Sequence, residues 1–474
     1  MRRSGPHLKR YAQIARLLWK HGRTDLVRQM SAADGIDIPT PAESTAEEPG
    51  PLRLLAAVAW LGCAIPAALA LNGCASTTVN YKIRCPYGVD DPQFGRTVSS
   101  LLGPPLVSGT TVTTLQNGDA IFPAMLDAIR SAMQSITFET YVYWSGSVGV
   151  AFADALSERA AAGVQVRVLI DAVGGQKVDK KYIERMRKAG AKVVLYHPLK
   201  WFNLTAASKL DYRTHRKLLV IDGKIGFTGG VGIADAWLGN AQDKDHWRDT
   251  HYRIEGPVVA ELQAAFLDNW MEVTGEVLDG IRYFPAIEDA GTQSTQLVKS
   301  SARGGSESMH LLYLLSIAAS RRSICLSTPY FVPDEQTSRA LVDARARGVR
   351  VQIVVPGSHI DEHLVREASR SRWGPLLEAG VEINEYQPTM FHCKLMIVDE
   401  LWTSVGSANL SSRSFGLNSE ANLNVLDAGF AAEQKRVFDE DVAKSKRITY
   451  SAWQKRPLLG RIEEVFITPL IPQL

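Results

Sequence analysis

The chain has 474 residues, 45% hydrophobic and 22% charged, a composition typical of a globular protein with a sizeable core. The formal net charge of +3, from 53 basic and 50 acidic residues, excludes the strongly basic composition that would by itself indicate a nucleic-acid-binding protein. The length allows two or three domains. The five cysteines form no C-x-x-C pair and lie at no zinc spacing with histidine, which argues against a structural metal site.

The first 50 residues differ in composition from the rest of the chain. Residues 7–30 are basic and carry Tyr11, Ile14 and Leu18 at helical spacing, which predicts a small surface helix. Residues 31–50 are acidic and rich in Pro, Ala and Ser, which predicts a linker.

An uncharged run follows at residues 54–71 and is just long enough to span a bilayer. Directly after it, residues 71–76 (LNGCAS) resemble a bacterial lipobox, in which Cys74 would be lipidated. We therefore expect residues 51–76 to form either a membrane span or a lipoprotein-type signal, with a buried core helix as the alternative. Basic residues are frequent before the run and only Lys82 and Arg84 follow closely, which places the bulk of the chain on the outer, periplasmic side.

A regular alternation of helices and strands begins after a lead-in at residues 77–110. Helical periodicity predicts helices at 120–133, 149–162 and 179–189. Segments rich in β-branched and aromatic residues predict strands at 135–144, 164–171 and 191–196. This alternation indicates an α/β layered domain.

The same series then recurs. The second set has predicted helices at 306–319, 338–347 and 366–379, and predicted strands at 323–330, 349–355 and 381–386. Residues 162–166 (AGVQV) correspond to residues 347–351 (RGVRV). We therefore expect two duplicated α/β layered domains, at 111–291 and 308–474, joined by a linker at 292–307 where Gly, Ser and Thr cluster.

Each repeat carries one copy of the polar triplet H-x-K-x-x-x-x-D. The copies are His215, Lys217 and Asp222, and His392, Lys394 and Asp399. If each copy begins on a strand, its His and Lys point to one face, Cys393 faces the core, and each Asp lies at a turn. Any one of these residues could be structural, but recurrence of all three at identical spacing favours a function.

Two such units packed together would bring two histidines and two lysines into one cleft. That set suits a phosphodiester, because lysines neutralise the non-bridging oxygens and stabilise the transition state. One imidazole can attack phosphorus while the other protonates the leaving oxygen and then activates the incoming alcohol or water. These roles require one neutral and one charged histidine, and they require no metal or other cofactor.

These motifs resemble the phospholipase D superfamily, and within it the bacterial cardiolipin synthases, over about residues 100–474. The superfamily motif H-x-K-x4-D-x6-G-[GS]-x-N is completed by Gly406-Ser407-Ala408-Asn409 in the second copy. The first copy has Gly229-Gly230-Val231-Gly232, with Gly232 at the Asn position. Further matches are Glu139-Thr140-Tyr141, residues 328–334 (TPYFVPD) and Asn418-Ser419-Glu420. The resemblance implies two phospholipase D-like α-β-α sandwich domains with the active site at their interface.

The resemblance also implies roles for individual residues. His215 would be the nucleophile and His392 the acid and base. Asp222 and Asp399 would support the site without taking part in the chemistry. The phosphoryl oxygens would be contacted by Ser407, Asn409 and Gly230. Asp249 and Glu420 resemble the carboxylates that hydrogen-bond the catalytic imidazoles in this family.

The function implied is a membrane-anchored transfer of a phosphatidyl group between phospholipids, which makes cardiolipin from phosphatidylglycerol, with phosphatidylethanolamine as an alternative substrate. The apolar loop at 199–204 and the tail at 458–474 would suit a lipid surface. Two alternatives remain: a hydrolase, as a phospholipase D or a nuclease, and a catalytically inactive lipid-binding protein. A nuclease is disfavoured because the basic residues are scattered, so no nucleic-acid partner is expected. Because one chain carries both motifs, the site requires no oligomer.

Overall fold

The computed structural model describes residues 79–198, 212–301 and 308–456. The predicted N-terminal helix, the span or signal at 51–76 with Cys74, the loop at 199–204 and the tail at 458–474 lie outside the described residues. Among the helices that are described, none combines the length and the apolar character needed to cross a bilayer.

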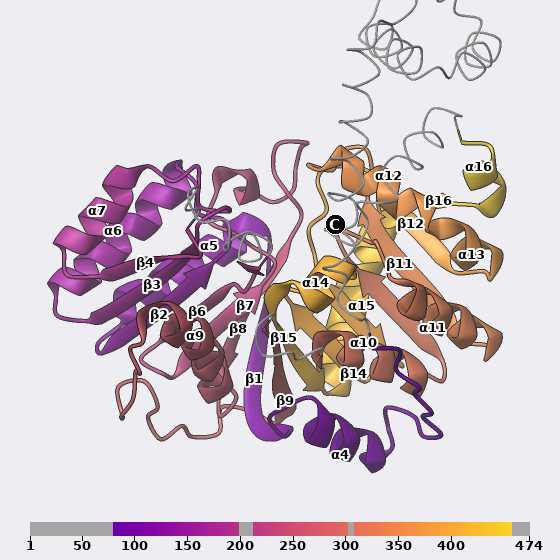
Figure 1. The fold of residues 1–474 in the computed structure, drawn as a ribbon, viewed down its shortest axis with the longest axis horizontal. Coiled ribbons are helices and arrows are strands. Elements are labelled where there is room, and N and C mark those ends of the chain that lie inside the picture. Colours follow the sequence, from indigo (N-terminus) through magenta and orange to yellow (C-terminus); the bar gives the residue numbers. More distant parts are fainter. Residues whose placement is uncertain (1–78, 199–211, 302–307, 457–474) are drawn as a thin grey trace, which may run out of the picture. The chain divides into compact units, whose positions relative to one another are not determined.

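The described strands join into one continuous sheet in which the two repeats lie edge to edge (Figure 1). The first repeat contributes the order β8-β7-β6-β2-β3-β4, and the second the order β15-β14-β13-β10-β11-β12-β16. Strands β9 and β1 lie between them. The bounds are β1 Val107–Gln116, β2 Ser135–Thr140, β3 Gln165–Asp171, β4 Lys192–Tyr196, β5 Arg213–Thr214, β6 Leu218–Ile221, β7 Ile225–Gly229, β8 Thr250–Glu255, β9 Gln293–Ser300, β10 Ser323–Ser327, β11 Arg350–Pro356, β12 Glu382–Tyr386, β13 Leu395–Val398, β14 Trp402–Gly406, β15 Asn418–Leu426 and β16 Ser445–Ile448.

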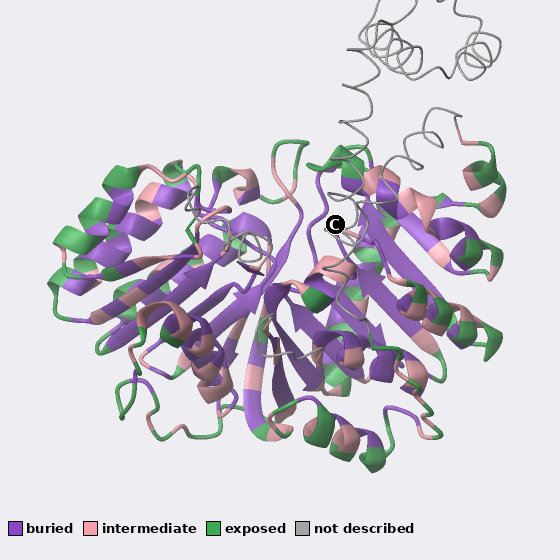
Figure 2. Cartoon of the chain, in the orientation of Figure 1, coloured by how far each residue is buried: buried purple, intermediate pink, exposed green. Residues whose placement is uncertain are grey.

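Helices cover both faces of each half of the sheet, so each repeat is an α-β-α sandwich (Figures 1 and 2). In the first repeat α5, α6 and α7 lie on one face and α9 on the other, and in the second α10, α11 and α13 lie opposite α15. The bounds are α4 Pro92–Leu101, α5 Asn117–Ser131, α6 Ser147–Ala161, α7 Lys180–Lys188, η2 Asp235–Trp237, α9 Val259–Thr274, α10 Ser308–Ala319, α11 Glu335–Ala346, α12 His363–Ser371, α13 Trp373–Glu378, α14 Ser412–Gly416, α15 Ala428–Ala443 and α16 Tyr450–Gln454.

Strand β13 shows why the apolar run between Lys394 and Asp399 is needed. Met396 and Val398 pack into the core beneath α10, α11 and α13, whereas Leu395 and Ile397 pack into the core that includes α15. Since side chains alternate along a strand, a strand covered on both faces must be apolar throughout. The run therefore anchors the motif in the middle of the sandwich.

The predicted helices and strands of the two repeats are confirmed within a few residues, with one division. The sequence predicted a single helix at 366–379, but the structure has α12 and α13, which meet at Arg372. Pro375 has no N–H to donate to the carbonyl of Ser371, and its ring would collide with that carbonyl in a continuous helix.

Two predicted connecting segments are structured. The linker prediction at 292–307 was wrong for its first part, which forms strand β9 and pairs with both β15 and β1. The Ser and Thr residues there resemble a turn in sequence, but Leu297 and Val298 are buried in the core. The lead-in contains helix α4, whose Phe94 packs edge-on against Trp402 of the second repeat at 5.0 Å between ring centroids.

Candidate active site

The histidine and lysine of each triplet lie in an extended segment just before a strand, rather than on the strand as the sequence predicted. These segments leave their own sheet neighbours and pair with the other repeat. The His215 N–H donates to the Ser419 carbonyl at 2.9 Å, and the His392 N–H donates to the Arg248 carbonyl at 2.8 Å. Both histidines are therefore held at the junction of the repeats.

Each imidazole is bound by a carboxylate from the other repeat. His215 Nδ1 lies 3.0 Å from Glu420 Oε2, and His392 Nδ1 lies 2.7 Å from Asp249 Oδ2. All four residues are buried. Because an ionised carboxylate can only accept, Nδ1 of each ring carries the hydrogen and Nε2 keeps its lone pair. Each repeat thus supplies the carboxylate that binds the motif histidine of the other repeat.

Both motif lysines are buried beside their histidines. Lys217 Nζ donates to the His215 carbonyl, and Lys394 Nζ donates to the His392 carbonyl, each at 2.8 Å. Lys394 Nζ also lies 3.2 Å from both ring nitrogens of His392. Burial lowers the pKa of Lys217 to about 7, with repulsion from Lys394 adding to the effect, and burial lowers the pKa of Lys394 to about 8.

The structure does not support one neutral and one charged histidine in the ligand-free site. Burial lowers the pKa of His215 to about 4, and burial together with Lys394 lowers that of His392 to about 3. The carboxylate partners oppose these shifts but do not overcome them. Both imidazoles are therefore neutral at neutral pH, and an anionic phosphodiester beside them would raise their pKa again.

The two carboxylates have different supports. Glu420 accepts hydrogen bonds from Ser407 Oγ at 2.6 Å and Ser414 Oγ at 2.8 Å. Asp249 accepts from Trp237 Nε1 at 2.9 Å and from the Thr250 N–H at 2.8 Å. Burial opposes ionisation of both, but the neighbouring imidazole and lysine outweigh it, so the pKa of each carboxyl is lowered. Ser407, predicted to contact phosphoryl oxygens, here supports Glu420.

The two motifs end differently, at residues 229–232 in the first repeat and at residues 406–409 in the second. Asn409 is buried, and its Oδ1 has no hydrogen-bond partner within the described residues. Gly230 stands at the motif position that Ser407 occupies in the second repeat. A side chain at Gly230 would collide with Asp249, so the glycine leaves room for this carboxylate. A Cβ at Gly232 would lie 2.7 Å from Val142 Cβ, so the missing Asn of the first motif has no space to occupy.

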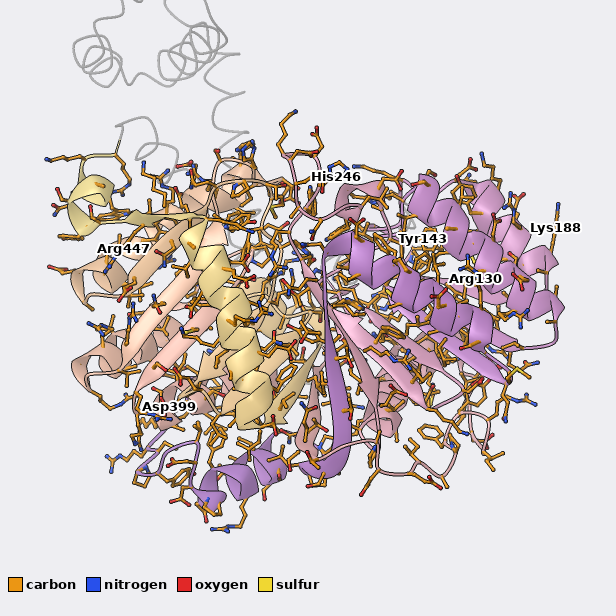
Figure 3. All side chains as sticks on the ribbon, turned by 180° about the vertical axis from the view of Figure 1, so that it is seen from behind. Arg130, Tyr143, Lys188, His246, Asp399 and Arg447 are labelled. Atoms are coloured by element: carbon orange, nitrogen blue, oxygen red, sulfur yellow. The ribbon has the colours of Figure 1, made fainter. Side chains whose placement is uncertain are left out.

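Asp222 and Asp399 are not brought to the histidines. Each lies at the far end of its strand and accepts hydrogen bonds from three successive backbone N–H groups, those of residues 133–135 and 321–323 respectively. Figure 3 shows Asp399 at the end of the second repeat that is remote from His246. Their φ values of 51° and 53° place both in the left-handed region, as a tight hairpin turn requires. Each carboxylate therefore ties its turn to the residues at or just before the start of a neighbouring strand, β2 or β10.

Two buried arginines that the sequence analysis missed join the repeats at the site. Arg216, within the first triplet, donates to the carbonyls of Glu420, Ala265 and Ser300. Arg248 binds both carboxylate oxygens of Asp441 at 2.9 Å and donates to the Asp249 carbonyl at 2.8 Å. In the sequence, Arg216 is marked only by its place next to His215, and Arg248 only by its place next to Asp249. The burial of a charged residue cannot be read from one sequence, so neither arginine could be recognised there.

Among the described residues, more aromatic rings lie near His392 than near His215. Three rings lie near His392, namely Trp237, Trp247 and Tyr330, at centroid distances of 5.4, 5.6 and 6.3 Å. His215 has Tyr141 at 5.3 Å. None of these rings was singled out from the sequence, apart from motif matches that contain Tyr141 and Tyr330.

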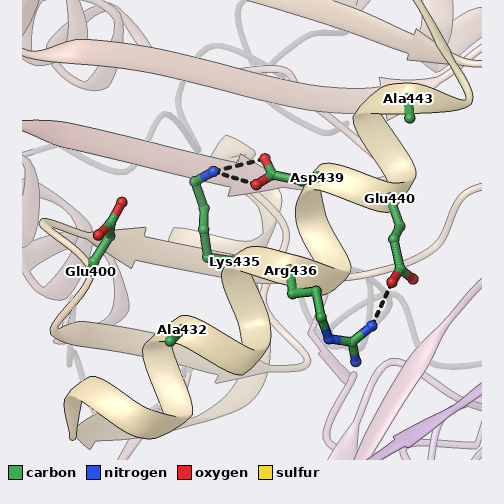
Figure 4. Close-up of a pocket in the computed structure, with 7 residues that line it drawn as sticks. All are labelled: Glu400, Ala432, Lys435, Arg436, Asp439, Glu440 and Ala443. Atoms are coloured by element: carbon green, nitrogen blue, oxygen red, sulfur yellow. Dashed lines mark hydrogen bonds and ion pairs between the residues drawn. The ribbon is translucent and has the colours of Figure 1, made fainter.

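A separate hollow lies along α15, at the turn that contains Glu400 (Figure 4). Its cations are paired within the helix, Lys435 with Asp439 and Arg436 with Glu440. It does not include the histidines or lysines of the motifs. In the part of the chain that the structure describes, no group of three or more His, Cys, Asp or Glu side chains is arranged to hold a metal ion.

Comparisons with known proteins agree with this arrangement. The family model described as cardiolipin synthase, PLD-like domain, matches residues 125–270 and 313–442. Cardiolipin synthase 1 of Bacillus cereus is 34% identical over 380 residues, which cover 78% of this chain and 74% of that protein. Cardiolipin synthase 2 of Bacillus anthracis is 38% identical over 367 residues, which cover 77% of this chain and 71% of that protein.

A solved structure, phosphatidylserine synthase of Haemophilus influenzae, shares the fold with a TM-score of 0.60 at 12% identity, and the match covers 80% of this chain and 99% of that chain. The repeated domain, the paired triplets and the relatives all lead to one assignment. The chain belongs to the family of cardiolipin synthases with phospholipase D-like domains.

Proposed function

We propose that this chain is a phosphatidyltransferase that makes cardiolipin from phosphatidylglycerol through a phosphohistidine intermediate. The observation that carries the proposal is the pair of buried imidazoles, each with its Nδ1–H held by a carboxylate of the other repeat. Both rings are thereby held in the tautomer that leaves the lone pair on Nε2, beside two lysines that can bind one phosphodiester. The cardiolipin synthases among its relatives support this substrate class.

In the first step His215 would act as the nucleophile. Its Nε2 attacks phosphorus, a P–N bond forms, and the bond from phosphorus to the leaving glycerol oxygen breaks. His392, which becomes protonated when the anionic substrate binds, donates its proton to that oxygen. The choice of His215 follows the family resemblance, in which the first motif supplies the nucleophile; Lys394 Nζ lies 3.2 Å from Nε2 of His392, whereas Lys217 donates to a carbonyl.

In the second step a hydroxyl of another phosphatidylglycerol molecule attacks the phosphohistidine. His392 takes the hydroxyl proton, a new P–O bond forms, and the P–N bond breaks with its electron pair returning to His215. Lys217, Lys394 and the amide of Asn409 would bind the non-bridging oxygens throughout. Glu420 and Asp249 would keep both rings in the reactive tautomer, as the carboxylate of a catalytic triad does.

The substrates are lipids, and we propose that residues 51–76 anchor the chain in the membrane, either as a span or through lipidated Cys74. The support is the uncharged run at 54–71 and the excess of basic residues before it, which favours an outer location for the catalytic repeats.

The test is lipid mass spectrometry with the full chain in vesicles of phosphatidylglycerol. We expect cardiolipin and free glycerol, and no turnover by His392→Ala. His359→Ala, which removes an exposed histidine, serves as the matched control. Phosphatidic acid without cardiolipin would instead identify a hydrolase, and full activity of His392→Ala would refute the two-histidine mechanism. A parallel assay with phosphatidylethanolamine added would identify a second donor.

A further inference from the structure

Two indole rings lie beside the imidazole of His392. Trp237 and Trp247 pack edge-on at 4.5 Å between centroids, and both lie within 5.6 Å of the His392 ring. Trp237 is 2% exposed and donates to Asp249, so it supports the carboxylate. Trp247 is only partly buried, so part of this residue is accessible to solvent.

The backbone around Trp247 is fixed from both repeats. Its own N–H donates to the Ala236 carbonyl at 2.7 Å, within the first repeat. The residues on either side are held by the second repeat: Thr389 Oγ1 donates to the His246 carbonyl at 2.9 Å, and the Arg248 N–H donates to the Met390 carbonyl at 2.9 Å. The indole is thus a rigid apolar surface beside the imidazole, with little conformational entropy to lose when a ligand binds.

Among the described residues, the aromatic neighbour of His215 differs from those of His392, although each histidine has a motif lysine beside it. The ring of Tyr141 lies beside His215, and Lys217 Nζ lies 5.7 Å from the centroid of that ring. A cation near the aromatic face suits a phosphate group. The paired indoles beside His392 suit carbon atoms, because an indole presents a large apolar face.

We propose that Trp247 is a specificity-determining residue that favours a lipid hydroxyl over water in the second step. This inference rests on the proposed function. Trp247 lies where the incoming oxygen loses its proton, so the carbons next to that oxygen would pack on the indole. Water has no such carbons and gains nothing from the contact.

The two competing reactions are the same in their bonding. In both, an O–H oxygen bonds to phosphorus, the P–N bond to His215 breaks with its electron pair returning to the ring, and the proton passes to Nε2 of His392. When the O–H group belongs to phosphatidylglycerol the product is cardiolipin, and when it belongs to water the product is phosphatidic acid. Each methylene removed from water changes such a competition by about fourfold, so contact with a glycerol unit corresponds to a preference on the order of ten- to fiftyfold.

The experiment measures the ratio of phosphatidic acid to cardiolipin formed by the full chain in phosphatidylglycerol vesicles, in water enriched in 18O. Trp247→Ala is expected to raise this ratio about tenfold, with 18O in the phosphatidic acid, while total consumption of phosphatidylglycerol changes less. Trp247→Phe should fall between wild type and Trp247→Ala, because it keeps part of the apolar face. Trp144→Ala, which removes a partly buried indole of the first repeat outside the site, is the control.

An unchanged ratio in Trp247→Ala, or an equal rise in Trp144→Ala, would overturn the inference. If Trp247→Ala does not fold, Trp247→Phe and Trp247→Leu decide: both should raise the ratio by less than tenfold, and a wild-type ratio in both would refute the role. The proposed function fails separately, because in that case the wild-type chain itself would form no cardiolipin.

Discussion

Nδ1 of His392 lies 2.7 Å from Oδ2 of Asp249, and the two residues belong to different repeats. The same crossing joins His215 to Glu420. Neither repeat therefore supplies both the motif histidine and its carboxylate, so these two pairs form only when the repeats pack together.

Replacing Asp249 by Asn tests this pairing. The shape of the side chain is kept, but the charge that stabilises the imidazolium is lost and the ring can adopt the wrong tautomer. We expect kcat to fall by roughly 10² to 10⁴ with a much smaller change in KM, as in a triad that has lost its carboxylate. Steady-state kinetics with phosphatidylglycerol measures both constants. Trp237→Phe removes only one donor to Asp249 and should be milder; a kcat within threefold of wild type for Asp249→Asn would contradict the assignment.

Replacing Arg248 by Met should reduce both stability and activity. The substitution leaves Asp441, which is 3% exposed, as a buried carboxylate without its bidentate partner. The expected loss in the free energy of unfolding is about 3 to 5 kcal/mol. Adding Asp441→Asn should recover part of the lost stability, since the effects of substitutions at two residues in contact do not add. Denaturant titration checks this, and Arg436→Met on the exposed face of α15 is the control, with an expected change below about 0.5 kcal/mol.

The lysines predict an unusual alkaline limit for activity. Burial lowers the pKa of Lys217 to about 7 and that of Lys394 to about 8, so in the free enzyme both ammonium groups lose their protons as pH rises through this range. We expect kcat/KM to fall between pH 7 and 9, as one coupled titration of the pair. His215, whose pKa is lowered to about 4, loses its nucleophilic lone pair only as pH falls through that value, so it sets no limit near neutral pH. A kcat/KM that stays constant up to pH 9.5 would show that the lysines keep their charge.

Restoring the family Asn at position 232 should harm the protein. A side chain there meets Val142 and the ring of Trp237, so Gly232→Asn is expected to destabilise by about 1 to 3 kcal/mol through overpacking, without raising kcat. Thermal unfolding and kinetics are the measurements. Val142→Ala in the same chain should recover part of the stability; a gain in activity from Gly232→Asn alone would show that the glycine is a defect.

Asp399→Ala separates fold from chemistry. It removes the acceptor of the backbone N–H groups of residues 321–323. Leaving these donors unsatisfied should reduce the free energy of unfolding by about 1 to 3 kcal/mol, while kcat of the folded enzyme remains near wild type. Activity measured well below the unfolding temperature tests this. A loss of kcat by more than tenfold in folded protein would return Asp399 to the chemistry.

The duplication, the alternation of helices and strands, and the two histidines and two lysines that come together could be predicted from the sequence, whereas the remote positions of Asp222 and Asp399 could not. In each motif an apolar run lies between the His–Lys pair and the Asp at the turn, a pattern that indicates a strand buried on both faces. Two copies of the same His, Lys and Asp spacing favour one shared site. The resemblance added Asp249 and Glu420.

The pairing and the charges of the site residues depend on how the two repeats pack together. The crossing of His215 to Glu420 and of His392 to Asp249 depends on contacts between residues far apart in the chain, which local patterns do not encode. Burial set the lowered pKa values of both histidines and both lysines, against the charged histidine that the mechanism had suggested. The same burial explains Arg216, Arg248 and Trp247: an arginine or a tryptophan looks the same in a sequence whether it faces solvent or joins two repeats, because the free energy of desolvation depends on packing in three dimensions.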